Sequence, residues 1–372
     1  MEYCQCSRCL MDTTAKGIEF DEQGVCNYCR DFEKLLLQGP KQRINLSLEA
    51  LVEQIKNDGK GKPYDCIVGV SGGVDSSYTL VKVKELGLRP LAVHMDNGWD
   101  SELAANNIKN LVEGLGVDLY THVIDWDEYR ELMQAFFDAD VIDIELLYDN
   151  AMLAVNYEQS AKYGIRYILA GTNTSTEGMR IPENWNWFKY DKKNIYRLAR
   201  TKGIKIKTFP AFGTADFIKY EYFKRIRWIS FLDYLEDYNK FEALKILKEH
   251  YGYKPYPYKH YESIFTRFYQ GYILPEKFNV DKRKLHLSTL IISRQITKEE
   301  ALKQMGGKYG YPSDKELKED IDYFFKKMRW TKEDLDAYLK RPEKPHENYG
   351  SEKKLFTTLL GIYKFLKKFK AR

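Results

Sequence analysis

The segment that most constrains the fold is Asp65–Ser77, in which a short apolar run ends in small polar residues. Cys66–Val70 is typical of a strand and Ser76–Leu86 has helical spacing, so the sequence DCIVGVSGGVDSS predicts a strand, a glycine loop and a helix. The first turn of a helix presents unpaired N–H groups to an anion, and glycines let a phosphate approach the backbone closely. The segment therefore predicts a phosphate-binding turn.

The same alternation continues over the next hundred residues. Further strands are expected at Leu91–Met95, Leu119–Ile124 and Tyr167–Ala170, and a helix at Ser101–Leu115 that ends at Gly116. Strands separated by helix-length segments predict an α/β fold with a doubly wound parallel sheet, in which ligands bind at the carboxyl ends of the strands. The loops expected to carry the site are Ser71–Asp75, Asp96–Asp100 and Gly171–Arg180.

Composition and patterning predict four parts: a cysteine-rich module at 1–38, a helix and linker at 39–63, an ATP-binding α/β domain at 64–213, and a mostly helical substrate or partner region at 214–372. A net charge of +5 over 372 residues does not by itself indicate nucleic-acid binding. The first residues lack the pattern of a signal peptide, and no run of about 18 apolar residues predicts a membrane span. We therefore expect a cytoplasmic protein.

The glycine loop offers several groups to a phosphate. The residues expected to bind it are Ser71, Gly72, Gly73, Val74, Asp75, Ser76 and Ser77. A Walker A loop would require a lysine, and a dinucleotide-binding fold would require three glycines at fixed spacing. The loop contains neither feature. Asp75 suits an anion site only if it caps the helix or holds a Mg²⁺ ion that bridges phosphates. The alternative is an ordinary strand-to-helix turn with an aspartate cap.

Five of the six cysteines lie within the first 29 residues, which favours metal binding in a reducing compartment over a disulfide framework. Two Cys-x₂-Cys pairs, Cys6 with Cys9 and Cys26 with Cys29, have the spacing of a zinc ribbon and predict a structural Zn²⁺ site. Cys4 is the weaker candidate because Cys6 completes the two-residue spacing. The alternatives are redox-active thiols or a metal cluster.

The stretch Ser71–Ser76 resembles the PP-loop of the ATP pyrophosphatase superfamily, whose signature is Ser-Gly-Gly-x-Asp-Ser. The resemblance implies transfer of AMP from ATP to a carbonyl oxygen, with release of pyrophosphate and with Mg²⁺ at the phosphates. It also implies catalytic roles for Asp75 and Ser76. Two later segments should complete the nucleotide pocket: His94, Met95 and Asp96 beside the adenosine, and Gly171, Thr172 and Asn173 from a later strand.

Several longer stretches together are similar to the N-acetyl sugar amidotransferase family of bacterial surface-glycan pathways. They are CSRCLMDTTAKGIEFDEQGVCNYC, GVSGGVDSSY, DNGWDSELAANNI, GTNTSTEG and the segment from Tyr261 to Leu302. The resemblance covers nearly the whole chain. It implies conversion of an acetamido group on a sugar, expected to be nucleotide-linked, to an acetamidino group: ATP adenylates the oxygen, ammonia attacks the carbon, and AMP departs.

The resemblance also implies a separate source of ammonia, because the six histidines and six cysteines show no glutaminase signature. The expected partner is a glutaminase resembling that of imidazole glycerol phosphate synthase, with or without a cyclase-like subunit. Two other functions remain open. A tRNA thiolase would share the PP-loop, although no cysteine follows Cys66 to carry sulfur. A nucleotide-sensing zinc protein without turnover is the third possibility.

Outside the loop, five residues are candidates for chemistry or substrate binding. Glu177 could bind Mg²⁺ or take a proton from the incoming ammonium, or it could be an exposed loop acid. Trp99 and Trp185 could stack on a sugar or base, although tryptophans of this kind are more often core residues. Lys282 and Arg283 could clamp a phosphate or carboxylate, or could belong to a solvated charge run.

The last segment, Lys353 to Arg372, repeats apolar residues at helical spacing with lysines opposite them. Such a helix could touch an anionic membrane or a partner protein. The more ordinary interpretation is a surface helix packed on its own domain.

Overall fold

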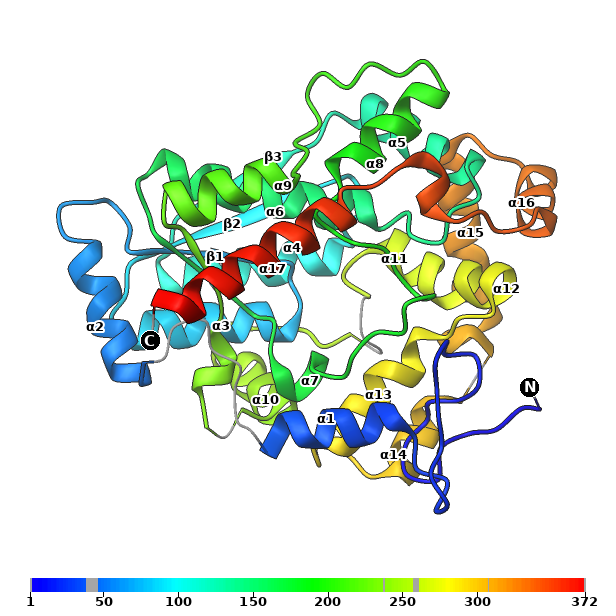
Figure 1. Cartoon of the computed structure of the whole chain (residues 1–372), viewed down its shortest axis with the longest axis horizontal. Helices are drawn as coiled ribbons and strands as arrows, with labels where there is room; N and C mark the ends of the chain where they lie inside the picture. The colour runs from blue at the N-terminus through cyan, green and yellow to red at the C-terminus, as the bar shows by residue number, and fades with distance from the viewer. Residues whose placement is uncertain (1, 38–45, 237, 257–260, 307, 371–372) are drawn as a thin grey trace.

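The computed structural model describes residues 2–37, 46–236, 238–256, 261–306 and 308–370 (Figure 1). Its centre is a five-stranded sheet in the order β3-β2-β1-β4-β5, in which every pair of neighbours is parallel. The strands are β1 (Cys66–Gly69), β2 (Pro90–Asp96), β3 (Leu119–Val123), β4 (Tyr167–Ala170) and β5 (Arg227–Ser230). The strand order reverses between β1 and β4, which is the position where doubly wound sheets bind ligands. The predicted fold class is confirmed.

Helices cover both faces of the sheet because the strand residues alternate between two apolar cores. On one face, Val68 and Leu169 pack in a core that includes residues of α2, α3, α4 and α10. On the other face, Ile67 and Ile168 join a larger core with residues of α5, α6 and the N-terminal module. The helices of these two layers are α2 (Leu48–Asp58), α3 (Val74–Glu85), α4 (Glu102–Leu115), α5 (Trp126–Asp138), α6 (Leu146–Lys162) and α10 (Lys240–Tyr251).

The remaining helices surround this sandwich. They are α1 (Asn27–Leu37), α7 (Thr174–Glu177), α8 (Lys192–Thr201), α9 (Thr214–Ile218), α11 (Ile264–Phe268), α12 (Leu274–Phe278), α13 (Lys282–Ile292), α14 (Lys298–Gln304), α15 (Asp314–Met328), α16 (Lys332–Lys340) and α17 (Lys353–Lys370). Within the described residues, no helix is long and apolar enough to cross a membrane.

The termini of α4 show how local sequence sets an element. The Ser101 hydroxyl accepts a hydrogen bond from the Ala104 N–H at 3.2 Å and caps the first turn. Gly116 follows the last turn with φ of +57°, in the left-handed conformation that glycine adopts at low cost. Both boundaries agree with the helix predicted from sequence.

The fifth strand was not expected, because the sequence analysis predicts a mostly helical region from residue 214. β5 pairs with β4 from Tyr167 opposite Arg227 to Ala170 opposite Ser230. Its four-residue run, RWIS, is too short and too polar to be recognised as a strand from the sequence. The sheet therefore continues past residue 213, where the sequence analysis places the end of the α/β domain.

The N-terminal module packs against the C-terminal helices near the bottom of Figure 1, where α1, α13 and α14 lie together. Leu10 is buried with Leu287 and Ala301, and its backbone N–H donates to the Ser288 hydroxyl at 3.0 Å. Lys284 of α13 forms an ion pair with the fully buried Asp12. A helix of the C-terminal region is therefore held by the first residues of the chain.

Candidate functional site

The glycine loop follows β1 and leads directly into α3. Gly72 has φ of +80°, and a Cβ atom there would lie 3.1 Å from the Ala104 carbonyl oxygen, so this position requires glycine. The Ser71 N–H donates to the Ser76 hydroxyl at 3.3 Å, and that hydroxyl donates to the Gly73 carbonyl at 3.2 Å. Gly73 is the N-cap of α3 and supplies no side-chain cap. The first turn of α3 is thus built like an anion-binding helix start.

The end of β4 lies directly against this loop. A Cβ atom on Gly171 would lie 2.6 Å from the Ser76 nitrogen and 2.8 Å from the Asp75 carbonyl carbon, so only glycine fits between the two segments. Asn173 accepts a hydrogen bond from the Thr176 N–H at 2.9 Å and caps α7. Two loops from neighbouring strands therefore form one edge of a pocket.

Asp75 is held by two hydroxyl groups. The Thr176 hydroxyl donates to one carboxylate oxygen at 3.1 Å, and the Tyr238 hydroxyl donates to the other. Burial, together with the charge of Asp75, raises the pKa of Tyr238 far above its ordinary value, so this phenol remains a donor. The carboxylate is therefore fixed in direction at the mouth of the loop.

The loop opens onto a cavity of about 720 Å³. The nucleotide-loop side is lined by Ser71, Gly73, Val74, Asp75, Ser76, Met95, Gly171, Thr172 and Glu177. Residues of the C-terminal region also line the cavity, among them Lys282 and Arg283 of α13. The structure therefore brings most of the predicted nucleotide residues and both predicted basic residues to one cavity, with Glu177 among them.

One face of α6 lines the cavity. The residues of α6 there follow helical spacing from its N-cap residue Glu145: Tyr148, Asp149, Met152 and Asn156. The Asn156 side chain is buried, and its carbonyl oxygen lacks a hydrogen-bond partner among the described residues. A buried acceptor of this kind is suited to a donor group of a bound ligand.

Two lysines that line the cavity form ion pairs with neighbouring carboxylates. The Lys189 ammonium lies 2.6 Å from the Asp143 carboxylate and 2.8 Å from that of Asp149, and Lys282 lies 2.8 Å from Glu145. Desolvation raises the pKa of Asp149 against the opposing effect of Lys189. The cavity therefore presents both signs of charge to a ligand and can hold polar groups of either kind.

Four of the predicted nucleotide residues stand behind the cavity wall. Gly72 of the loop and Ser77 of α3 do not line the cavity, and Asn173 acts as the α7 cap. His94 is buried, with Nδ1 2.9 Å from the Val70 carbonyl and Nε2 2.9 Å from the Asp100 carboxylate. Burial opposes its protonation, but Asp100, the Val70 carbonyl and Asp96 together raise the pKa of His94.

Asp96 also lies outside the cavity lining, and its carboxylate accepts the Gly98 N–H at 2.7 Å. This hydrogen bond makes Asp96 a cap of the loop that follows β2.

The two tryptophans proposed for stacking are core residues, and this corrects the prediction. Trp99 is fully buried; its ring lies 5.3 Å from that of Phe265, and its Nε1–H donates to the Met133 sulfur. Trp185 is 1% exposed and donates to the Thr14 carbonyl in the N-terminal module. Neither ring lines the cavity, because large aromatic side chains gain more from burial than from a solvated site.

Sequence reasoning missed several residues that build the site. The Tyr253 and Tyr256 hydroxyls donate to the Gly72 carbonyl oxygen at 2.8 and 3.1 Å and brace the loop. Asp149, Lys189 and Glu145 line the cavity from segments without a recognisable motif. Only the helical repeat of polar residues in α6 could have indicated a buried polar face.

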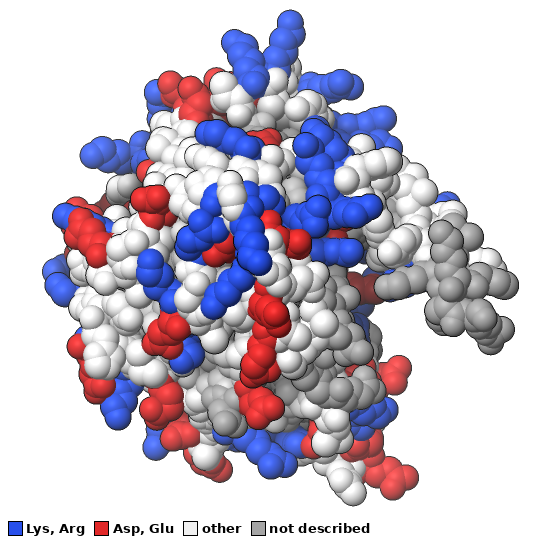
Figure 2. Space-filling model, turned by 90° about the vertical axis from the view of Figure 1, so that its left-hand side faces the viewer, with Lys and Arg blue, Asp and Glu red and all other residues white. Residues whose placement is uncertain are grey.

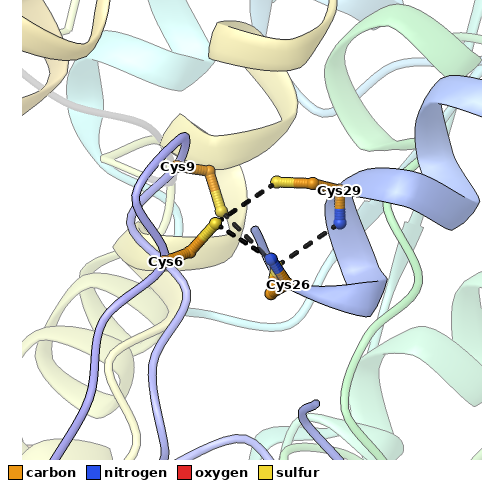
Figure 3. A group of neighbouring side chains, drawn as sticks. All are labelled: Cys6, Cys9, Cys26 and Cys29. Carbon is orange, nitrogen blue, oxygen red and sulfur yellow. Dashed lines mark hydrogen bonds between the residues drawn. The ribbon is translucent and has the colours of Figure 1, made fainter. Parts of the chain in front are cut away.

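The four predicted metal ligands converge (Figure 3). Their sulfur atoms are all buried and lie within 4.8 Å of one another, with Cys6 3.8 Å from Cys29 and Cys9 3.9 Å from Cys26. Zn–S bonds of about 2.3 Å give a tetrahedron with edges of about 3.8 Å. The sulfurs also accept backbone N–H groups, such as that of Cys26 on Cys6 at 3.2 Å. The donor set fits one structural Zn²⁺ ion, and Cys4 and Cys66 lie outside it.

Comparison with known proteins gives one family match. Residues 262–368 match the family model described as LPS biosynthesis protein WbpG-like, C-terminal domain. This segment contains α13 with Lys282 and Arg283. The match relates this part of the chain to proteins of lipopolysaccharide biosynthesis.

Two curated relatives match shorter segments. An uncharacterised protein, MJ1599, of Methanocaldococcus jannaschii is 32% identical over 118 residues, which are 31% of this chain and 41% of that protein. A glutamine-hydrolysing GMP synthase of Pyrobaculum aerophilum is 41% identical over 70 residues, which are 18% of this chain and 14% of the synthase. The matches thus span less than half the length of either relative.

A solved structure of NH3-dependent NAD synthetase from Campylobacter jejuni matches 60% of this chain and 82% of its own, with 15% identity and a TM-score of 0.28.

Proposed function

We propose that this protein is an ATP-dependent amidotransferase that acts on an N-acetyl sugar. The proposal is supported by the match of residues 262–368 to the WbpG-like C-terminal domain of lipopolysaccharide biosynthesis proteins. One observation carries the proposal. The phosphate-binding loop and the basic residues of the WbpG-like domain line the same cavity of about 720 Å³. A nucleotide and a sugar can therefore meet in it.

The loop is suited to the triphosphate of ATP. The N–H groups at the start of α3 and the Ser71 and Ser76 hydroxyls would bind the pyrophosphate portion. Asp75 and Glu177 would hold a Mg²⁺ ion, which neutralises charge on the phosphates. Met95 and Thr172 border the same space, where the adenosine would lie.

The reaction proceeds in two steps. The acetamido oxygen attacks the α-phosphorus of ATP, the bond to the bridging oxygen breaks, and pyrophosphate leaves. The product is an O-adenylyl imidate, whose carbon is a better electrophile than that of an amide. Ammonia adds to this carbon, loses a proton, and the C–O bond to AMP breaks to give the amidine. Glu177 is the proposed acceptor of that proton.

The sugar would lie between the loop and α13. Lys282 and Arg283 would contact its phosphate or carboxylate groups, as expected for a nucleotide-linked sugar. Ammonia would come from a glutaminase partner resembling that of imidazole glycerol phosphate synthase, with or without a cyclase-like subunit. We place the reaction in the cytoplasm, where ATP and nucleotide sugars are available.

The test is incubation of the purified chain with ATP, Mg²⁺, ammonium chloride and a nucleotide-linked diacetamido sugar. We expect AMP, pyrophosphate and a sugar in which one oxygen has been replaced by NH, all measured by mass spectrometry. Formation of ADP, or AMP without any change in the sugar, would overturn the proposal. Sulfur incorporation into tRNA, with persulfide as the donor, would support the thiolase alternative instead.

A matched pair of variants links turnover to the loop. Asp75→Asn keeps the size of the side chain but removes its charge, so we expect AMP formation to fall by about a hundredfold or more. Asp118→Asn removes a carboxylate whose partner is the Tyr64 hydroxyl on the surface, and it should leave turnover unchanged. Equal rates in the two variants would show that the chemistry lies elsewhere.

A further inference from the structure

The C-terminal helix carries an apolar face that the rest of the molecule leaves exposed. Figure 1 shows α17, in red, crossing the outside of the molecule to the C-terminal end. Leu355, Leu359 and Ile362 recur at helical spacing and are 54%, 37% and 51% exposed. Phe365, one turn further, is 61% exposed.

A different stripe of the same helix attaches it to the body. The Phe356 ring lies 5.1 Å from that of Phe217 and 5.2 Å from that of Tyr190. At the start of the helix, the Glu352 carboxylate accepts the Thr214 N–H at 2.6 Å and the Lys193 N–H at 3.1 Å. The orientation of α17 is thus fixed by contacts that leave its Leu355–Leu359–Ile362 stripe facing outward.

A second element extends this apolar surface. The Tyr222 and Tyr363 rings lie 4.8 Å apart, and the next residue, Phe223, is 79% exposed. We call the exposed side chains of α17 together with those of residues 222–225 the α17 surface. Aromatic and aliphatic groups from two separate segments therefore lie side by side on it.

The charges on this surface are positive. Lys353, Lys354 and Lys364 of α17 are exposed, and the sequence of the helix contains no acidic residue. Lys224 and Arg225 are exposed beside Phe223. The nearest acids in the sequence, Glu221 and Glu352, are turned inward: Glu221 is buried, and Glu352 accepts the backbone N–H groups described above. A cationic surface with exposed apolar and aromatic side chains is complementary to a partner that has negative charges at its surface and an apolar interior below them.

We propose that the α17 surface docks the protein onto an anionic lipid bilayer, with α17 lying in the plane of the interface. Leu355, Leu359, Ile362 and Phe365 enter the boundary between headgroups and acyl chains, and the lysines contact the lipid phosphates. The charge distribution favours this occupant over a second copy of the chain, because two copies would bring two cationic surfaces together. Docking is independent of the amidation chemistry proposed above.

The test is flotation of the full chain with vesicles of phosphatidylcholine alone or of three parts phosphatidylcholine to one part phosphatidylglycerol. We expect binding only to the anionic vesicles, weakening as salt is raised. The variant Leu359→Glu/Ile362→Glu should lower the partition coefficient by about tenfold or more. The variant Lys224→Gln/Lys364→Gln should lower it by about fivefold for each lysine replaced.

The control is Val123→Glu/Leu302→Glu, which adds the same negative charge as Leu359→Glu/Ile362→Glu but at two exposed apolar residues outside the α17 surface. It should bind like the unaltered protein. AMP formation and the melting temperature report whether each variant is folded. Two results would overturn the proposal: no binding to anionic vesicles at low salt, or equal losses in all three variants. A dimer in mass photometry that only the Leu359→Glu/Ile362→Glu variant abolishes would assign the surface to a second copy instead.

Discussion

At the scale of single residues, the site depends on places where a side chain would not fit. Gly171 is the tightest of them, because a Cβ atom there would overlap the backbone of Ser76 and Asp75. The neighbouring atoms are main-chain atoms and cannot rotate away as a flexible side chain could. The contact between the end of β4 and the loop therefore fixes both halves of the proposed phosphate site.

Replacing Gly171 tests this contact. In Gly171→Ala the added methyl group must push the loop away from β4, at a cost of about 1–3 kcal/mol in unfolding free energy. We expect a lower melting temperature and an affinity for ATP at least about tenfold weaker in calorimetry. Gly361→Ala is the control, because a Cβ atom at Gly361 meets nothing within 4 Å. Unchanged ATP affinity in Gly171→Ala would contradict the proposed site.

A second residue gives the protein a predictable response to acid. His346 is buried against the Trp187 ring, with its Nε2 accepting the Asp143 N–H at 3.2 Å and its Nδ1 2.9 Å from the Asn194 side-chain oxygen. This geometry suits the neutral ring. Burial lowers the pKa of His346 from 6.5 to about 4.

The unfolded chain therefore takes up a proton at His346 below about pH 6.5, whereas the folded chain does so only below about pH 4. Stability is present above pH 6.5 and is lost as the pH falls toward 4. The loss between pH 7.5 and 5 should be about 2 kcal/mol. In urea unfolding, the free energy of unfolding of His346→Gln should fall between pH 7.5 and 5 by about 2 kcal/mol less than that of the unaltered protein. His250→Gln, at an exposed histidine, should show the same fall as the unaltered protein. Identical pH profiles for all three would refute the assignment.

At the scale of elements, the cysteine module supports the cavity from behind. Lys284 and Ser288 of α13 are bound by residues of the module, while Lys282 and Arg283 of the same helix face the cavity. Phe32 of α1 lies against Gly178, where a Cβ atom would be 2.6 Å from its ring. The loop that carries Glu177 and the helix that carries the basic residues are thus both in contact with the module.

Removal of zinc should therefore affect both stability and chemistry. We expect one zinc per chain by atomic absorption in the unaltered protein and in Cys4→Ser, whose cysteine is exposed and outside the ligand set. Cys26→Ser should lose the metal and melt at a markedly lower temperature, because structural zinc contributes directly to folding free energy. Full zinc content in Cys26→Ser, or its loss in Cys4→Ser, would refute the assignment of ligands.

At the scale of the whole molecule, the sequence predicts the elements that have a periodic pattern and the sites that have a motif of fixed spacing. β1 to β4, α4, the glycine loop and the four cysteines were all predictable, because periodicity and fixed spacing depend on neighbours in the chain. β5 was missed because its pairing with β4 comes from the fold and not from its four residues. Trp99 and Trp185 were misplaced because residue type alone does not distinguish a stacking platform from a core side chain.

The polar side of the cavity shows the same limit. Glu145 and Asp149 are one turn apart at the start of α6, but Lys189 comes from a later segment and meets Asp149 only in the folded chain. The Tyr238 hydroxyl reaches Asp75 across 163 positions of the sequence. Such contacts are set by the packing of the C-terminal region onto the sheet, which no local pattern records.

The packing of α13 against the cavity leads to a last prediction, which rests on the proposed sugar-binding role of α13. The loop should bind ATP, and α13 should bind the sugar. Arg283 is paired with Asp281 at 2.7 Å, at the cavity wall. In Arg283→Gln we expect KM for the sugar to rise about tenfold, because a charge-assisted hydrogen bond contributes about 1.5–3 kcal/mol. KM for ATP should stay within about twofold. Lys303→Gln, which removes an exposed cation from α14, should change neither constant. If Arg283→Gln weakened ATP and sugar equally, α13 would be part of the nucleotide site, and the division between loop and C-terminal helix would be wrong.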